Sequence, residues 1–267
     1  MIETEGAGRT FKVRGTVVHA VRELSFRVEA GEFVGCLGPN GAGKSTTIKM
    51  LTGILTPTAG RVSVAGLDPS RQRTALARRI GVVFGQRTTL WWDLPLKDSF
   101  ELIRLLYKVD RKVFRERLDE LCALLDMGKF LATPVRQLSL GQRMRGDITA
   151  ALLHAPDVLV LDEPTIGLDV VSKAGVRDFL RRVNAEHGTT VLLTTHDLGD
   201  VERLCRRVLL IDHGSLAFDG TVADLRAMVP GETSIEDVVA HLYLNSPGSP
   251  RTPPDRRPAD DPPSVTA

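Results

Sequence analysis

The chain has 267 residues, a formal net charge of +2, 42% hydrophobic residues and 25% charged residues. These values fit one large α/β domain or two small ones, and the small net charge gives no electrostatic argument for nucleic acid as a partner. No apolar run approaches the roughly 20 residues that cross a bilayer, and Met1–Glu5 lacks the features of a signal peptide, so we expect a cytosolic chain.

The three cysteines, Cys36, Cys122 and Cys205, lie far apart and form no cluster with histidine. Spacing of this kind does not suit a disulfide framework or a zinc site. We interpret them as small hydrophobic residues in a reducing compartment.

The first third of the chain predicts strands joined by turns. Leu24–Val28 and Phe33–Leu37 flank a turn, and the second run is continuously apolar, as in a strand that is buried on both faces. A glycine-rich loop and a helix from about Lys44 to Thr52 follow. Ile80–Phe84 predicts another buried strand.

From about Pro95 to Ala155 apolar residues recur at helical spacing, which predicts a helical block with an apolar core. Strands then alternate with helices again, which indicates a mostly parallel sheet that is covered on both faces. The helical block is therefore an insertion. The later elements are expected as strands at Val158–Leu161, Thr190–Thr194, Val208–Ile211 and Leu216–Phe218, and as helices around 176–183 and 198–205.

The strongest functional signal is a glycine-rich loop of the pattern GxxxxGK[ST] between a buried strand and a helix. Its glycines allow backbone N–H groups to surround a phosphate chain, and the helix N-terminus adds a positive dipole. Lys44 would reach the β- and γ-phosphates, and the Ser45 hydroxyl would ligate Mg²⁺. The predicted nucleotide-binding residues are Gly38, Pro39, Asn40, Gly41, Ala42, Gly43, Lys44, Ser45 and Thr46.

A second signal is the apolar run Val158–Leu161 followed by two carboxylates, Asp162 and Glu163. Asp162 would hold Mg²⁺, directly or through water. Glu163 lies one residue further on, where a carboxylate can activate or position the water that attacks the γ-phosphate. Together the two motifs predict a P-loop NTPase.

The segment Leu138–Gln142, which reads LSLGQ, precedes the second motif. Here the chain resembles the ABC ATPase family, whose signature usually reads LSGGQ, with Leu140 in place of the usual glycine. Ser139 and Gln142 also fit a capping box at a helix N-terminus. The resemblance implies that Ser139, Gly141 and Gln142 bind the γ-phosphate of an ATP that is held by a second subunit.

Other residues follow in the order of the family. Gln86 is similar to the Q-loop glutamine, which contacts Mg²⁺ and the attacking water; Asp169 matches the D-loop; and His196 matches the switch histidine, which orients the catalytic carboxylate. Phe11 is the candidate for stacking on adenine, although a role in core packing is equally consistent, and His19 is a poorer alternative.

The resemblance covers about residues 9–230 and implies an α/β fold: a RecA-like P-loop NTPase core with a mostly parallel sheet, an antiparallel β region and an inserted helical subdomain. The last segment is rich in proline and charge and is expected to be disordered. The expected organisation is an ABC ATPase domain over 1–245, with a core of 1–94 and 156–230, a helical subdomain of 95–155 and a C-terminal helix at about 234–244, followed by a tail of 246–267.

The resemblance also implies partners. A second ATPase subunit, identical or paralogous, would form a head-to-tail dimer that ATP closes, and an integral membrane permease would hold the chain at the inner face of the cell membrane. The likeness is strongest to bacterial drug-, antibiotic- or sodium-export ATPases that pair with ABC-2-type permeases. Adjacent tryptophans are good interface anchors, so we expect Trp91 or Trp92 to contact the permease.

Two other readings are possible. A soluble ABC-class ATPase could act on nucleic acid or the ribosome, but the chain has no internal repeat, no heptads and no basic stripe. A different P-loop enzyme, such as a small-molecule kinase, would need an acceptor pocket and would have no use for the signature segment or for His196.

Overall fold

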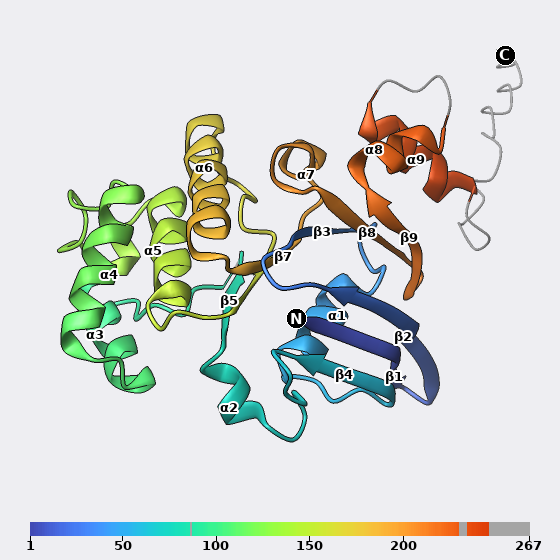
Figure 1. Ribbon diagram of the computed structural model, residues 1–267, viewed down its shortest axis with the longest axis horizontal. Coiled ribbons are helices and arrows are strands. Elements are labelled where there is room, and N and C mark those ends of the chain that lie inside the picture. Colours follow the sequence, from blue (N-terminus) through green and yellow to red (C-terminus); the bar gives the residue numbers. More distant parts are fainter. Residues whose placement is uncertain (86, 230–233, 246–267) are drawn as a thin grey trace, which may run out of the picture.

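The computed structural model describes residues 1–85, 87–229 and 234–245 (Figure 1). Gln86 and the proline-rich segment 246–267, both of which carry expectations from the sequence, lie outside the described residues.

A six-stranded sheet forms the centre of the molecule. Its first five strands are parallel neighbours, and the last strand joins them as an antiparallel hairpin. The predicted mostly parallel sheet is therefore confirmed. In spatial order the strands are β5 (Ile80–Phe84), β6 (Val158–Asp162), β7 (Thr190–Thr194), β3 (Phe33–Leu37), β8 (Arg207–Asp212) and β9 (Ser215–Thr221).

The central strands are buried on both faces, which explains their continuous apolar sequences. In β6, Leu159 and Leu161 face one hydrophobic cluster, whereas Val158 and Val160 face a second cluster on the opposite side of the sheet. The first cluster continues into the helical block and the long helix α6 (Val170–His187). The sheet is thus held between two cores, and the ends of its strands are left to carry the site.

A three-stranded antiparallel sheet lies at one end of the molecule, with strand order β2–β1–β4 (Figure 1). The antiparallel β region that the family resemblance implied is confirmed, but the register of its strands was not predicted. The β1–β2 register is shifted at three places along its length, which breaks the period-two pattern that would reveal the pairing. The elements of this end are β1 (Ile2–Val13), β2 (Thr16–Val28), β4 (Ala59–Val64), α1 (Lys44–Leu51) and α2 (Arg73–Ala77).

The helical block lies at the opposite end of the molecule, as Figure 1 shows. Its predicted apolar core is confirmed, since Phe100 is fully buried and Phe114 and Leu121 nearly so. Among the described residues, no helix combines the length and the apolar character that a membrane crossing requires. The block comprises α3 (Leu96–Tyr107), α4 (Arg111–Leu124), the short 3-10 helix η1 (Val135–Gln137) and α5 (Leu140–Leu152). The remaining helices of the described residues are α7 (Leu198–Leu204), α8 (Val222–Ala227) and α9 (Ile235–Asn245).

The three cysteines are free thiols, as expected from their spacing. Cys36 and Cys205 are buried and Cys122 is half-buried. Burial raises the pKa of Cys36 to about 12 and that of Cys122 to about 11, so both thiols stay protonated near neutral pH. They act as small apolar side chains rather than as nucleophiles.

Candidate active site

The carboxyl ends of four parallel strands meet at one edge of the central sheet, where ligands of open α/β sheets bind. A cavity of about 760 Å³ opens there. It is lined by the whole glycine-rich loop, residues 38–46, which follows β3, and by the residues at the ends of β5, β6 and β7. The other lining residues are Ala20, Lys49, Ile54, Phe84, Gly85, Arg87, Asp162, Glu163, Ile166 and His196.

The glycine-rich loop is built to place α1 against this cavity. Gly43 is the residue before α1 and has a φ of 106°, a conformation that L side chains rarely adopt. A Cβ at this position would also lie 2.5 Å from the Ala20 carbonyl oxygen. Glycine is therefore required where the chain turns into the helix, and the helix N-terminus faces the cavity.

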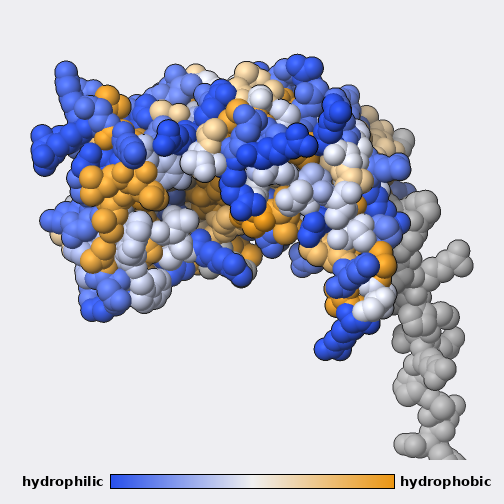
Figure 2. Space-filling view, turned by 90° about the horizontal axis from the view of Figure 1, so that it is seen from below, coloured by the Kyte–Doolittle hydropathy of each residue, from blue (hydrophilic) through white to orange (hydrophobic). Residues whose placement is uncertain are grey.

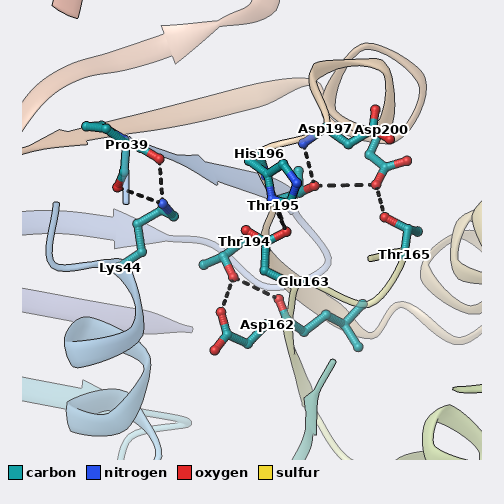
Figure 3. Close-up of polar contacts among 12 residues, drawn as sticks. Pro39, Lys44, Asp162, Glu163, Thr165, Thr194, Thr195, His196, Asp197 and Asp200 are labelled. Atoms are coloured by element: carbon teal, nitrogen blue, oxygen red, sulfur yellow. Dashed lines mark hydrogen bonds and ion pairs between the residues drawn. The ribbon is translucent and has the colours of Figure 1, made fainter. Parts of the chain in front are cut away.

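Lys44 is nearly buried and bonded to its own loop. Its ammonium donates hydrogen bonds to the carbonyl oxygens of Gly38, at 2.5 Å, and Pro39, at 3.1 Å (Figure 3). These bonds hold the positive charge within the cavity that the loop surrounds. A phosphate group entering the loop would meet that charge directly.

Asp162 ends β6 at the cavity wall and Glu163 directly follows it, and each is held by a group from β7 or from the loop after β7 (Figure 3). The Thr194 hydroxyl donates to Asp162 Oδ1 at 2.6 Å. His196 Nδ1 lies 2.8 Å from Glu163 Oε2, and the His196 backbone N–H donates to the same oxygen at 3.4 Å. The structure thus brings together the predicted carboxylates and the predicted histidine.

The backbone at Glu163 is strained. Its φ of 56° lies in the left-handed region, which is uncommon for a residue with a side chain. Gly85 packs against the same segment, and a Cβ there would lie 2.1 Å from the Glu163 carbonyl oxygen. The position of Glu163 is therefore set by its own backbone conformation and by the close approach of the backbone at Gly85.

The donor set at the cavity fits a magnesium ion. The Asp162 carboxylate and the Ser45 hydroxyl both line the cavity. Oxygen ligands of this kind suit Mg²⁺, which is commonly held by one or two carboxylates together with substrate phosphates.

The signature segment lies elsewhere. Among the described residues that line the cavity, none comes from Ser139, Gly141 or Gln142. The predicted capping box is confirmed at the N-terminus of α5: the Gln142 N–H donates to Ser139 Oγ at 3.2 Å, and Gln142 Oε1 accepts from the Ser139 N–H at 2.9 Å. Within one chain, these residues and the glycine-rich loop do not meet.

Two other predicted residues also lie outside the cavity lining. Asp169 caps α6, since Oδ1 accepts from the N–H groups of Val171 and Ser172, each at 3.0 Å. A hydrogen bond from the Ser172 hydroxyl lowers the pKa of Asp169, with further help from the backbone N–H groups. Phe11 lies on β1, where the guanidinium of Arg9 stacks 4.7 Å from its ring centroid.

Several residues that support the site were not foreseen. Thr194 pairs with Asp162 in the β6–β7 register, so the strand alignment could have suggested their contact. Asp147 and Asp200 are buried carboxylates on helices, and the sequence gives only a weak signal for them: a charged residue within an otherwise apolar helical face. Their partners come from distant segments and follow only from the fold.

Comparisons with known proteins identify the family of the chain. The family model described as "ABC transporter" matches residues 21–166. The ABC transporter ATP-binding protein NatA of Bacillus subtilis (strain 168) is 35% identical over 225 residues, which cover 84% of this chain and 91% of NatA. The chain belongs to the ABC transporter family. It is an ATPase of the ABC class and an ATP-binding subunit of a transporter.

Other ABC proteins are similar over comparable lengths. The daunorubicin resistance ATP-binding protein DrrA3 of Streptomyces coeruleorubidus is 40% identical, with 80% of this chain and 67% of that protein covered. A solved structure of an ATP-binding subunit of an ABC transporter superposes with a TM-score of 0.81 at 25% identity, covering 91% of this chain and 99% of that one. The ABC cassette MJ0796, in a dimeric post-hydrolysis state bound to ADP and Pi, superposes with a TM-score of 0.76 at 26% identity. The match covers 83% of this chain and 99% of that one.

Proposed function

We propose that two such chains, identical or paralogous, bind ATP head to tail, with each nucleotide between the glycine-rich loop of one and Ser139–Gln142 of the other. The observation that carries this proposal is the separation of the two halves of the site: the signature segment does not line the cavity of its own chain. The N-terminus of α5 offers backbone N–H groups and a positive dipole end to an anion. A partner's γ-phosphate would supply that anion.

Within the cavity, the residues divide the work of hydrolysis. Lys44 and the loop N–H groups line the cavity and would hold the β- and γ-phosphates, while Ser45 and Asp162 would hold Mg²⁺, which would neutralise charge on the phosphates. Glu163 takes a proton from the attacking water, whose oxygen bonds to the γ-phosphorus as the bond to ADP breaks. His196 orients Glu163, with which it is in contact. From the family resemblance, Gln86 would contact Mg²⁺ and the attacking water, Asp169 would bind the nucleotide, and Phe11 would stack on adenine.

The site test uses Glu163→Gln. We expect this variant to bind ATP, hydrolyse it more than about a hundredfold more slowly, and accumulate as a dimer, because the γ-phosphate that bridges the two chains persists. Size-exclusion chromatography with light scattering, with and without Mg-ATP, measures the dimer. Wild-type turnover by Glu163→Gln would remove Glu163 from its role, and a monomer under all conditions would contradict the shared site.

We further propose that the chain powers export through an ABC-2-type permease and lies at the inner face of the cell membrane through that partner. Support comes from relatives named for resistance: DrrA3, and the linearmycin resistance protein LnrL of Bacillus subtilis (strain 168), which is 33% identical. The methionine import protein MetN 2 of Enterococcus faecalis is 32% identical. The higher identity to DrrA3, 40%, favours export.

Two exposed tryptophans in the loop just before the helical block offer a surface for that permease. Trp91 and Trp92 are 40% and 50% exposed, and Figure 2 shows apolar side chains exposed over this end of the molecule. The loop itself is anchored, because the Trp91 N–H donates to the buried Ser99 hydroxyl at 3.2 Å and the Arg143 guanidinium lies over the Trp92 ring at 5.6 Å. A fixed loop that presents two aromatic rings suits an interface.

The partner test is co-purification of the tagged chain from detergent-solubilised membranes of its source cells. We expect an integral membrane protein of about six spans in stoichiometric amount, a span being about 20 apolar residues. Replacing Trp91 and Trp92 together with alanine should release this membrane protein, whereas Leu106→Ala, which truncates a 71% exposed leucine on α3, should not. A complex that survives the double replacement would contradict the proposed contact.

A further inference from the structure

A buried carboxylate lies behind the catalytic pair. Asp200, on α7, is fully buried and does not line the cavity. Its Oδ1 accepts from the Arg177 guanidinium on α6, with Nε at 2.5 Å. Its Oδ2 accepts from the hydroxyls of Thr165 and Thr195, the second at 3.4 Å (Figure 3). One oxygen thus holds the charge partner and the other holds two loop threonines.

The two threonines belong to the loops that carry the catalytic pair. Thr165 lies two residues after Glu163, and Thr195 directly precedes His196. The Thr195 hydroxyl also accepts from the Asp197 N–H at 2.9 Å, which fixes the turn after the histidine. The two loops are therefore joined to each other through Asp200, on the side away from the contact between Glu163 and His196.

A second ion pair fastens the same loop to α6. Lys173 Nζ lies 2.5 Å from Asp197 Oδ2, and Arg177 Nη2 lies 3.6 Å from Asp197 Oδ1. Arg177 thus bridges Asp197 and Asp200. Burial of a carboxylate is unfavourable unless the group is paired and hydrogen-bonded, and Arg177 and the two threonine hydroxyls meet that requirement for Asp200.

We propose that Asp200 is a positioning residue for ATP hydrolysis: by binding Thr165 and Thr195 on one oxygen, it holds the two loops at the separation at which His196 meets Glu163. This inference rests on the proposed role of Glu163. Thr165, Thr195 and Asp200 are not in the cavity lining, so they act on the alignment of the carboxylate rather than on nucleotide affinity.

The test is Thr165→Val, which removes one hydroxyl, keeps the β-branched shape and leaves the Asp200–Arg177 pair intact. We expect kcat to fall by at least about tenfold, because small misplacements of catalytic groups are costly, with KM for ATP changed by less than about twofold. Thr165→Ser should restore kcat. The matched control is Thr149→Val, at a fully buried threonine whose hydroxyl instead contacts Met127 Sδ at 3.5 Å.

Two further measurements separate positioning from a general loss of stability. In the Glu163→Gln background, Thr165→Val should lower the residual rate no further, because it acts through the missing carboxylate. Without nucleotide, amide hydrogen exchange over 195–198 should speed up in Thr165→Val and not in Thr149→Val. If Thr165→Val does not fold, Thr195→Val carries the same expectations.

The outcomes distinguish this inference from the proposed function. A wild-type kcat for Thr165→Val, in a chain that Glu163→Gln inactivates, overturns the role of Asp200 alone. Equal losses in Thr165→Val and Thr149→Val also overturn it, because they would show a structural effect. Wild-type turnover by Glu163→Gln overturns the proposed function itself.

Discussion

The stability of the protein should depend on pH through Asp147, a carboxylate on α5 that is only 5% exposed. Its Oδ1 accepts from the Thr88 hydroxyl at 2.9 Å, the Thr89 N–H at 3.0 Å and the Thr89 hydroxyl at 3.3 Å. Burial raises the pKa of Asp147 from its ordinary 3.8 to about 6, against the opposing effect of these hydrogen bonds and of the Arg143 charge.

The sign follows from that direction. A carboxyl whose pKa is higher in the folded state binds its proton more tightly there, so protonation stabilises the fold. The contribution is fully present below about pH 3.8 and is lost as the pH rises through about 6. This stabilisation of the fold by protonation amounts to about 3 kcal/mol in all, and about 1 kcal/mol of it is gained between about pH 7.5 and pH 5.

The assay compares urea unfolding of the wild type and Asp147→Asn at these two pH values. The asparagine keeps an oxygen that can accept the hydrogen bonds but does not titrate. The two tryptophans of the chain, Trp91 and Trp92, lie just after Thr88 and Thr89, so their fluorescence reports on this part of the fold.

On going from high to low pH, the wild type should gain about 1 kcal/mol more in the free energy of unfolding than Asp147→Asn. The control is Asp119→Asn, which removes an exposed carboxylate on α4 and should show no such difference. An equal pH response of Asp147→Asn and the wild type would refute the reasoning.

Three other changes test the cavity and the signature segment. Lys44→Ala should weaken ATP binding at least about tenfold in a fluorescent-nucleotide titration, because a charge-assisted contact with the phosphates is lost; unchanged affinity would count against the loop. Gly85→Ala should slow hydrolysis and lower the free energy of unfolding by about 1–3 kcal/mol, since its Cβ would overlap the Glu163 carbonyl oxygen; a wild-type rate and stability would show that this approach is not needed. Leu140→Gly should cost about 2 kcal/mol in urea unfolding through lost helix propensity and burial, and no measurable cost would mean that this side chain packs against nothing.

The cavity could be predicted from the sequence because its parts are local in sequence. The glycine-rich loop and the Asp162–Glu163 pair each directly follow an apolar run that can only be a buried strand. In a parallel sheet such strand ends meet at one edge, so the spatial contact of these motifs follows without knowledge of the packing. His196 could be placed for the same reason, since it follows β7.

The support behind the cavity could not be predicted in this way. Asp200 and Thr165 are 35 residues apart, and nothing in the chain between them marks their contact. The same holds for Asp147 and Thr88, which are 59 residues apart. Periodicity shows which helical face is buried, but a buried carboxylate on that face finds its partners only once the loops opposite it are in place.

The leucine in the signature segment is compatible with phosphate binding because of where its side chain lies. A Cβ on Gly167 would lie 2.9 Å from Leu140 Cδ2, so Leu140 is directed toward its own D-loop. The Ser139 hydroxyl accepts the Gln142 N–H, and a hydroxyl that accepts one bond still has its proton to donate to an anion. The capping hydrogen bond therefore orients the Ser139 hydroxyl and leaves its proton available to an anion. Since Gly167 lies only four residues after Glu163, the contact with Leu140 also ties the helix that would receive a partner's phosphate to the loop that carries the proposed catalytic carboxylate.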